Sequence, residues 1–287
     1  MKDEKKIVKN FYENYGWQRT EDGIYKDTAA FVDTRPVMRN YQQHAMTRLA
    51  KCFHKSGNLF LDVGSGALGY DEYTNVGADF QQRVCADISL NALRQAKGNY
   101  DGDLWCVVAD ISALPFRDNV FDGVLCAHVL YHLPAADQAP AIHELHRLVA
   151  SEGCCVIVYT WATCLMNTLA LSLNPRKIFP KIPGMRLVWR TFFKSTMKNT
   201  METPCQPPPS PPLFFCPQDY TWYRKEIAPN LPVALACWQA VSLPFSQAFI
   251  LDKHLSRILL GAISFLEKVF PAFMGRIGAY PLFILHK

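Results

Sequence analysis

The stretch LFLDVGSGALG, residues 59–69, constrains the fold more than any other part of this sequence. Its first five residues are apolar apart from Asp62 and predict a buried strand, and a glycine-rich loop follows at once. Glycines let the backbone turn sharply and let a ligand approach the main chain. A strand that runs into a G-x-G-x-x-G loop is typical of the start of a doubly wound α/β sheet, although a tight strand-to-helix turn gives the same pattern.

Strands and helices alternate after this point. Near-continuous apolar runs predict strands at 59–63, 83–87, 104–109, 123–127, 154–159, 234–243 and 279–286. Helices are predicted at 2–16, 36–54, 90–97, 136–149 and 254–270, the last of them amphipathic. Alternation of this kind favours a mostly parallel sheet that is covered by helices.

Charge and cysteine usage narrow the class of protein. The 287 residues carry a modest net charge of +5 without a Lys/Arg cluster of the nuclear or RNA-binding kind, so nucleic acid is not expected as a partner. The ten cysteines are scattered and form no C-x-x-C pair, which favours free thiols in a reducing compartment and no metal site. The charged start MKDEKKIVKN is unlike a signal peptide, and we expect a cytoplasmic protein.

Two long stretches, 153–175 and 227–251, contain no Asp, Glu, Lys or Arg. Each is long enough to cross a bilayer. Polar residues and prolines interrupt them, so we interpret both as buried strands with flanking elements. Peripheral membrane contact stays open but is not favoured.

Residues 162–216 differ in character from the rest of the chain. They are first apolar, then basic, with seven Lys/Arg and no Asp or Glu between 176 and 198, and then proline-rich at 204–212. A proline run of this kind cannot form a helix or a central strand. We interpret the segment as an insertion that caps the carboxyl ends of the strands.

Polar side chains end the first three predicted strands. Asp62 closes the first, Asp87 ends the second and Asp110 ends the third. A carboxylate in the position of Asp87 can accept hydrogen bonds from both hydroxyls of a ribose. Each Asp taken singly is explained equally well as a helix cap or turn residue. Three in succession indicate one ligand at the carboxyl edge of the sheet.

At this point the sequence resembles the class I S-adenosylmethionine-dependent methyltransferases, in particular the small-molecule (type 11) subgroup related to quinone-biosynthesis enzymes. The most specific match is L-P-F-x-D-x-x-F-D-G-V at 114–124 with H-x-L-x-H at 128–132. The other matching stretches are LDVGSGALG (61–69), VCADISLNALRQAK (84–97) and AIHELHRLVASEGCCVIVY (141–159). The resemblance implies a Rossmann-like seven-stranded sheet of order 3-2-1-4-5-7-6, with the last strand antiparallel, and S-adenosylmethionine as cofactor.

The resemblance also implies which residues hold the cofactor. They are Asp62, Gly64 and Gly66 for the methionine moiety, Asp87 and Ile88 for the ribose and adenine, Asp110 and Ile111 for the adenine, and Cys126 with the following backbone near the sulfonium. One departure concerns the loop, because Leu68 occupies the position of the family's third glycine. The loop is therefore longer, or side chains such as Tyr70 reach the substrate.

A general base is required only when the methyl acceptor is a hydroxyl or a protonated amine. The candidates are His132, His128 and Tyr131, since histidine titrates near neutral pH. Packing near the cofactor or capping of the next helix would explain these residues as well. Substrate contacts are predicted at Tyr15, Arg35, Tyr70 and Trp161, with further aromatic and basic residues of the insertion at Arg186, Trp189, Arg190 and Phe192.

The sequence thus predicts an N-terminal helical lid (1–56), a cofactor-binding core (57–161), an inserted cap (162–216) and the C-terminal part of the core sheet (217–287). The predicted activity is methylation of oxygen or nitrogen on a small molecule, of specialised-metabolite or sugar type. Two alternatives remain: a peripheral membrane methyltransferase of a lipid or quinone, and a non-catalytic cofactor- or partner-binding protein on the same fold. Neither the acceptor nor the oligomeric state follows from the sequence.

Overall fold

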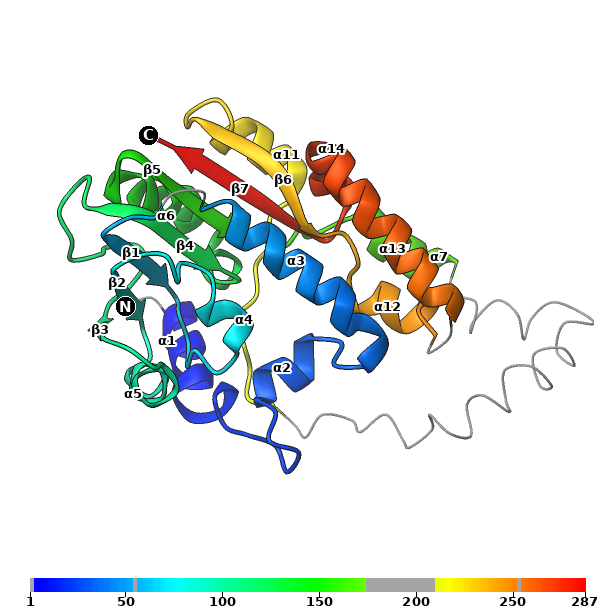
Figure 1. The fold of residues 1–287 in the computed structure, drawn as a ribbon, viewed down its shortest axis with the longest axis horizontal. Helices are drawn as coiled ribbons and strands as arrows, with labels where there is room; N and C mark the ends of the chain where they lie inside the picture. Colours follow the sequence, from blue (N-terminus) through cyan, green and yellow to red (C-terminus); the bar gives the residue numbers. More distant parts are fainter. Residues whose placement is uncertain (1–2, 54–55, 174–209, 252–253) are drawn as a thin grey trace, which may run out of the picture.

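The computed structural model describes residues 3–53, 56–173, 210–251 and 254–287, and its centre is one seven-stranded sheet (Figure 1). The strands are β1 (Leu59–Val63), β2 (Gln82–Asp87), β3 (Leu104–Val108), β4 (Phe121–Ala127), β5 (Val149–Val158), β6 (Val233–Gln239) and β7 (Tyr280–His286). Their order is β3-β2-β1-β4-β5-β7-β6. The first five run parallel, whereas β7 is antiparallel to both of its neighbours. The predicted strand order is confirmed.

Helices connect the strands and cover both faces of the sheet. They are α1 (Asp3–Phe11), α2 (Lys26–Phe31), α3 (Arg39–Lys51), α4 (Asp71–Thr74), α5 (Leu90–Asn99), α6 (Ala135–Leu148), α7 (Leu165–Ser172), α11 (Tyr220–Trp222), α12 (Leu243–Phe249), α13 (His254–Val269) and α14 (Pro271–Ile277). Single turns of other helix types lie at 12–16, 36–38, 130–132 and 223–227.

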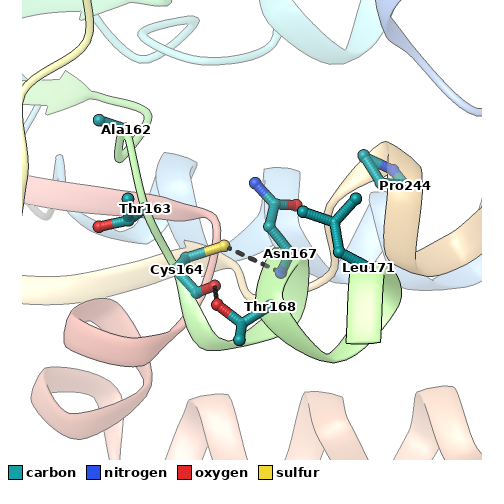
Figure 2. Close-up of a pocket in the computed structure, with 7 residues that line it drawn as sticks. All are labelled: Ala162, Thr163, Cys164, Asn167, Thr168, Leu171 and Pro244. Atoms are coloured by element: carbon teal, nitrogen blue, oxygen red, sulfur yellow. Dashed lines mark hydrogen bonds between the residues drawn. The ribbon is translucent and has the colours of Figure 1, made fainter. Parts of the chain in front are cut away.

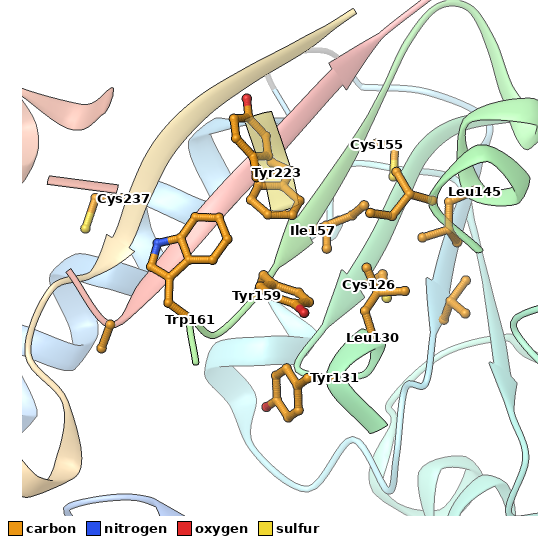
Figure 3. Close-up of a cluster of buried hydrophobic side chains, with 14 of the residues drawn as sticks. Cys126, Leu130, Tyr131, Leu145, Cys155, Ile157, Tyr159, Trp161, Tyr223 and Cys237 are labelled. Atoms are coloured by element: carbon orange, nitrogen blue, oxygen red, sulfur yellow. The ribbon is translucent and has the colours of Figure 1, made fainter. Parts of the chain in front are cut away.

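The core lies on both faces of the sheet because successive strand residues point to opposite sides. Leu61 and Val124 pack with Ile142 and Leu145 of α6 on one face. This cluster continues towards the carboxyl ends of the strands through the aromatic side chains of Tyr131, Tyr159, Trp161 and Tyr223 (Figure 3). On the other face, α3 packs against β1, β4 and β5.

The C-terminal third contains two helices that the sequence analysis missed. The strand predicted at 234–243 ends at Gln239, and α12 begins after Ser242, whose hydroxyl accepts a hydrogen bond from the Phe245 amide (3.2 Å). Pro244 lies in the first turn of α12 and Pro271 in the first turn of α14, where proline is favoured. The strand prediction extended to Leu243, and no element was predicted over the rest of α12 or over α14.

The insertion is described only at its two ends. Residues 174–209, which include Arg186, Trp189, Arg190, Phe192 and most of the proline run, lie outside the described residues. Before them comes α7, and after them the chain returns to the carboxyl edge, where the Cys216 amide donates to the Tyr131 carbonyl (2.7 Å). The nine cysteines within the described ranges are free thiols, as predicted.

Candidate active site

The glycine-rich loop after β1 has a backbone that only glycine fits. Gly64 and Gly66 have φ values of 67° and 59°, in the left-handed region that favours glycine. A Cβ atom on Gly64 would lie 2.2 Å from Val129, and one on Gly66 would lie 2.3 Å from the Trp17 ring. In this structure Trp17 of the N-terminal segment approaches the main chain at Gly66, and the approach of a ligand there stays a prediction.

Asp87 joins this loop to the start of α5. Its Oδ2 accepts a hydrogen bond from the Gly66 amide (2.9 Å) and its Oδ1 one from the Ser89 amide (2.8 Å). Burial raises the pKa of Asp87, and the backbone donors of Ser89, Gly66 and Ile88 offset part of that effect. The Ile88 side chain is half-buried beside it. Asp87 thus lies where a ribose ligand was predicted, and it also supports the loop.

Asp62 is held by an ion pair behind the loop. Arg83 Nη1 donates to Asp62 Oδ2 (3.0 Å), and both side chains are buried. Arg83 also donates to the Thr74 and Val76 carbonyls. Burial raises the pKa of Asp62 to about 6 in spite of the Arg83 charge. The contacts of Asp62 therefore support the loop, and its role with a ligand stays a prediction.

Asp110 follows β3 and is bound by the N-terminal segment. Lys5 Nζ donates to both of its carboxylate oxygens (2.9 and 2.7 Å), and the Ser112 amide donates to Oδ1 (2.9 Å). Burial alone would raise the pKa of Asp110, but these donors hold it below its ordinary value. Ile111 and Cys126 are buried in the main core, which continues directly beneath this edge of the sheet.

Residues 3–31, the first part of the segment 1–56 predicted as a lid and called the lid from here on, contact the ends of β1, β2 and β3. Besides Lys5 and Trp17, Glu13 accepts hydrogen bonds from the Ser89 hydroxyl (2.5 Å) and the Asn91 amide (3.3 Å). Figure 1 shows α1 next to α5, in agreement with these contacts. The lid therefore covers the same three strand ends for which a shared ligand was predicted.

A polar cluster of three side chains lies between the lid and the end of β4. The Tyr12 hydroxyl is 3.3 Å from Asp27 Oδ1 and 3.4 Å from His132 Nε2. His132 Nδ1 is 2.7 Å from the Phe214 carbonyl, which can only accept, so Nδ1 carries the proton and Nε2 has the free lone pair. Burial raises the pKa of Asp27 to about 6 and lowers that of His132 to about 4. At neutral pH both are unprotonated proton acceptors.

The other two candidates for a base lie in aromatic surroundings. His128 has a φ of 65° and its ring lies 4.7 Å from the Trp238 ring and 5.7 Å from the Tyr280 ring, on the side of β6 and β7. Burial lowers the pKa of His128 to about 4. Tyr131 packs against His132 (ring centroids 4.7 Å apart), and burial raises its pKa well above the ordinary value. Of the three candidate bases, His132 is the one that contacts Tyr12, which in turn binds Asp27.

The four predicted substrate residues do not gather at one place. Tyr15 lies under Lys26 within the lid (4.7 Å), and the Tyr70 hydroxyl donates to the Thr28 hydroxyl (2.9 Å). Arg35 binds Asp33 and the carbonyls of Ser246 in α12 and Ile250 just after it. Trp161 is buried, and its indole N–H donates to the Gly275 carbonyl (2.8 Å). Tyr70 lies nearest to the glycine loop, and substrate contact by any of them stays a prediction.

Sequence reasoning missed Lys5, Glu13 and Asp27. Lys5 and Glu13 contact a strand end or the start of a helix, whereas Asp27 binds Tyr12 within the lid. No local sequence pattern around these residues predicts their contacts, because charged residues of a short amphipathic helix ordinarily face solvent. The sequence could have indicated Tyr12 and Trp17, since aromatic side chains in an otherwise polar N-terminal segment are unusual.

A separate pocket of about 230 Å³ lies between α7 and α12 (Figure 2). It is lined by Ala162, Thr163, Cys164, Asn167, Thr168, Leu171 and Pro244. Cys164 Sγ accepts a hydrogen bond from the Asn167 amide (3.4 Å) at the start of α7. No predicted site residue lines this pocket, although Trp161 immediately precedes it in sequence.

Comparison with known proteins identifies the central part of the chain. Residues 61–157, from the middle of β1 to the end of β5, match the model of a methyltransferase domain. Residues 61–157 form a class I, S-adenosylmethionine-dependent methyltransferase domain. The sheet order is the one expected of this domain, and S-adenosylmethionine is its cofactor.

The individual relatives cover the chain unevenly. MJ0638 of Methanocaldococcus jannaschii, an uncharacterized protein, is 34% identical over 149 residues, 49% of this chain and 60% of that one. The probable methyltransferase ltbC of Aspergillus luteorubrus is 31% identical, over 34% of this chain and 39% of its own. The chain thus spans 60% or less of these curated relatives. A protein solved with the Haloferax volcanii Trm112 methyltransferase activator has the same fold over 91% of this chain and 96% of its own (TM-score 0.50, 16% identity).

The residues at the carboxyl edge of the methyltransferase domain fit this cofactor. Asp87 supplies a buried carboxylate that accepts a hydrogen bond from the Gly66 amide of the glycine-rich loop, which suits a ribose beside the main chain. Carbon atoms of the Trp17 ring lie against Gly66 of this loop, and the indole N–H is buried and has no partner in the described part of the chain. A buried donor of this kind favours a polar ligand beside Trp17.

Proposed function

We propose that this chain transfers the methyl group of S-adenosylmethionine to an oxygen or nitrogen of a small-molecule acceptor. When bound, the cofactor supplies a methyl group that a positively charged sulfur activates for attack by a nucleophile. Much of the protein's contribution is then alignment of the two reactants. The single observation that carries the proposal is Asp87, whose buried carboxylate joins the glycine loop and α5 within the methyltransferase domain.

The cluster of Tyr12, Asp27 and His132 supports a hydroxyl or protonated amine as the nucleophile. His132 Nε2 carries a lone pair and lies 3.4 Å from the Tyr12 hydroxyl, so an acceptor hydroxyl that replaces Tyr12 at this nitrogen can give its proton to it. A base whose pKa is near 4 holds that proton weakly. Asp27, with a pKa of about 6 and hydrogen-bonded to Tyr12, is the stronger base of the cluster.

The lid supports a small acceptor rather than a protein or nucleic acid. Lys5, Glu13 and Trp17 contact three strand ends, which leaves little of this edge open to a macromolecule. A specialised-metabolite or sugar-type acceptor, which carries several hydroxyls, matches the proton-accepting cluster. A non-catalytic binding protein would not need His132 and Asp27, two unprotonated proton acceptors, beside the Tyr12 hydroxyl.

Calorimetry with Asp87→Asn tests the proposal. Hydrogen bonds to a charged group contribute about 1.5–3 kcal/mol, so the variant should bind S-adenosylmethionine and its demethylated product roughly 10- to 150-fold more weakly. The matched control is Asp101→Asn, an exposed carboxylate after α5, which should bind like wild type. Unchanged affinity in a folded Asp87 variant, or tight NAD binding with no affinity for either ligand, would contradict the assignment.

A further inference from the structure

The outer face of α13 and α14 is apolar and uncovered. It consists of the exposed side chains of Leu255, Ile258, Leu259, Phe265, Leu266, Val269, Phe270 and Phe273. Leu255 is 76% exposed, Ile258 68% and Phe265 63%. Single exposed apolar residues are ordinary, but eight on two consecutive helices form a continuous surface of the kind that marks an interaction site.

The inner side of α13 explains why this face must point outwards. The polar side chains of Ser256 and Glu267 are buried towards the sheet, together with Leu260 and Ile263. Glu267 accepts hydrogen bonds from Tyr41, from Arg48 (2.5 Å) and from the Ala240 amide (2.7 Å). These contacts fix the rotation of α13 about its axis, so the apolar side cannot turn inwards. Figure 1 shows α13 beyond α3 on the outside of the molecule.

The charges on these helices have one sign. Arg257, Lys268 and Arg276 are exposed, whereas the single carboxylate of α13 and α14 is the buried Glu267. Apolar side chains mixed with basic ones suit the boundary between headgroups and acyl chains of an anionic bilayer. Two copies of the same face would bring like charges together, and the undescribed residues 174–209, which are also basic in sequence, would be repelled from it.

We propose that the outer face of α13 and α14 docks on the surface of a membrane that contains anionic lipid. Within the described residues no single helix is long and apolar enough to cross a bilayer. Only α13 and α14 taken together have the length and the apolar composition for it, and these two helices are bent by 118° relative to each other. The two uncharged stretches singled out in the sequence are elsewhere, in β5 with α7 and in β6 with α12. The surface and the methyltransferase site involve separate residues.

Co-sedimentation of the whole chain with vesicles tests this surface. Vesicles of phosphatidylcholine with about one third phosphatidylserine should bind the protein at least about tenfold more tightly than phosphatidylcholine alone. The double variant Ile258→Glu/Phe265→Glu should lose at least about tenfold of that affinity, because insertion of one large apolar side chain is worth about that factor. Raising the salt from about 0.1 M to 1 M should weaken binding by shortening the Debye length from about 10 to 3 Å.

The control variant is Trp105→Glu, which places a charge on another exposed apolar residue, 53% exposed on the edge strand β3. It should bind vesicles as wild type does, and circular dichroism should show all variants folded. Absence of vesicle binding, or equal binding by the double variant, would overturn the proposal. A dimer in analytical ultracentrifugation that the double variant abolishes, without vesicle binding, would assign the face to a second copy instead.

Discussion

At the residue scale, two effects act in opposite directions on His132. Burial lowers its pKa to about 4, although the hydrogen bond to the Phe214 carbonyl favours the protonated form. Histidine in an unfolded chain has a pKa of about 6.5. Between pH 6.5 and 4 the unfolded chain therefore binds a proton at this position that the folded protein does not. The stability from His132 is present above about pH 6.5 and is lost as the pH falls towards 4.

His132→Gln should remove this pH dependence. From pH 6.5 to pH 5 the free energy of unfolding of wild type should fall by up to about 2 kcal/mol more than that of the variant, since one pKa unit is about 1.4 kcal/mol. Asp27 and Asp62, with pKa values raised to about 6, act in the opposite direction, so only the difference between the proteins is informative. Urea unfolding at both pH values measures it. The exposed His143→Gln is the control, and equal pH dependence of the His132 variant and wild type would contradict the buried, neutral imidazole.

At the element scale, the lid depends on a few polar contacts with the strand ends. Lys5 is 9% exposed and holds Asp110, while Lys6, its neighbour in sequence, is 59% exposed and pairs with Asp3 of the same helix. Trp17 occupies the close approach to Gly66 that the cofactor is also expected to use. Binding of the cofactor must therefore shift Trp17, and the Lys5–Asp110 contact limits how freely the lid can move.

Lys5→Met should loosen the lid, whereas Lys6→Met should not. We expect amides of α1 to exchange with deuterium at least about fivefold faster in the Lys5 variant, because a hydrogen-bonded charged pair is worth about 1.5–3 kcal/mol before its partial exposure is discounted. Demethylated cofactor should also dissociate faster. Mass spectrometry of exchange in residues 3–31 measures the first effect. Equal exchange in the two lysine variants would mean that apolar packing alone holds the lid.

The elements differ in how far the sequence predicts them. Strands β1 to β4 were predicted within two residues and the end of β5 within one, because buried parallel strands are continuous apolar runs with turn residues at their ends. The antiparallel β7 was predicted within one residue as well, since it is also a continuous apolar run. Asp87 and the glycine loop lie at the predicted edge for the same reason. The role of Lys5 could not be predicted, since it depends on a contact with Asp110, which is far away in sequence. Periodicity indicated an amphipathic α13, but only the structure shows that its apolar side faces outwards.

At the scale of the whole molecule, one buried carboxylate joins three elements. Glu267 of α13 is fully buried and binds Tyr41 and Arg48 of α3 and the Ala240 amide after β6. Arg48 Nη2 also donates to the Trp238 carbonyl (2.6 Å). Burial raises the pKa of Glu267, and Arg48 offsets part of that rise. The group therefore connects the helix with the outer apolar face to the body that carries the methyltransferase site.

Removing the carboxylate charge should destabilise the whole molecule. Breaking a buried ion pair from one side costs about 3–5 kcal/mol, since the partner charge is left without compensation, and Glu267→Gln should lower the free energy of unfolding by an amount in the lower part of that range. Glu226→Gln, an exposed carboxylate, is the matched control and should change stability by less than about 0.5 kcal/mol. The double variant Arg48→Met/Glu267→Gln should recover part of the loss, because it removes the uncompensated charge as well. If the double variant is as unstable as the sum of its two single variants, the carboxylate stabilises through the Tyr41 and Ala240 hydrogen bonds rather than through Arg48, and α13 is attached to the sheet by neutral contacts.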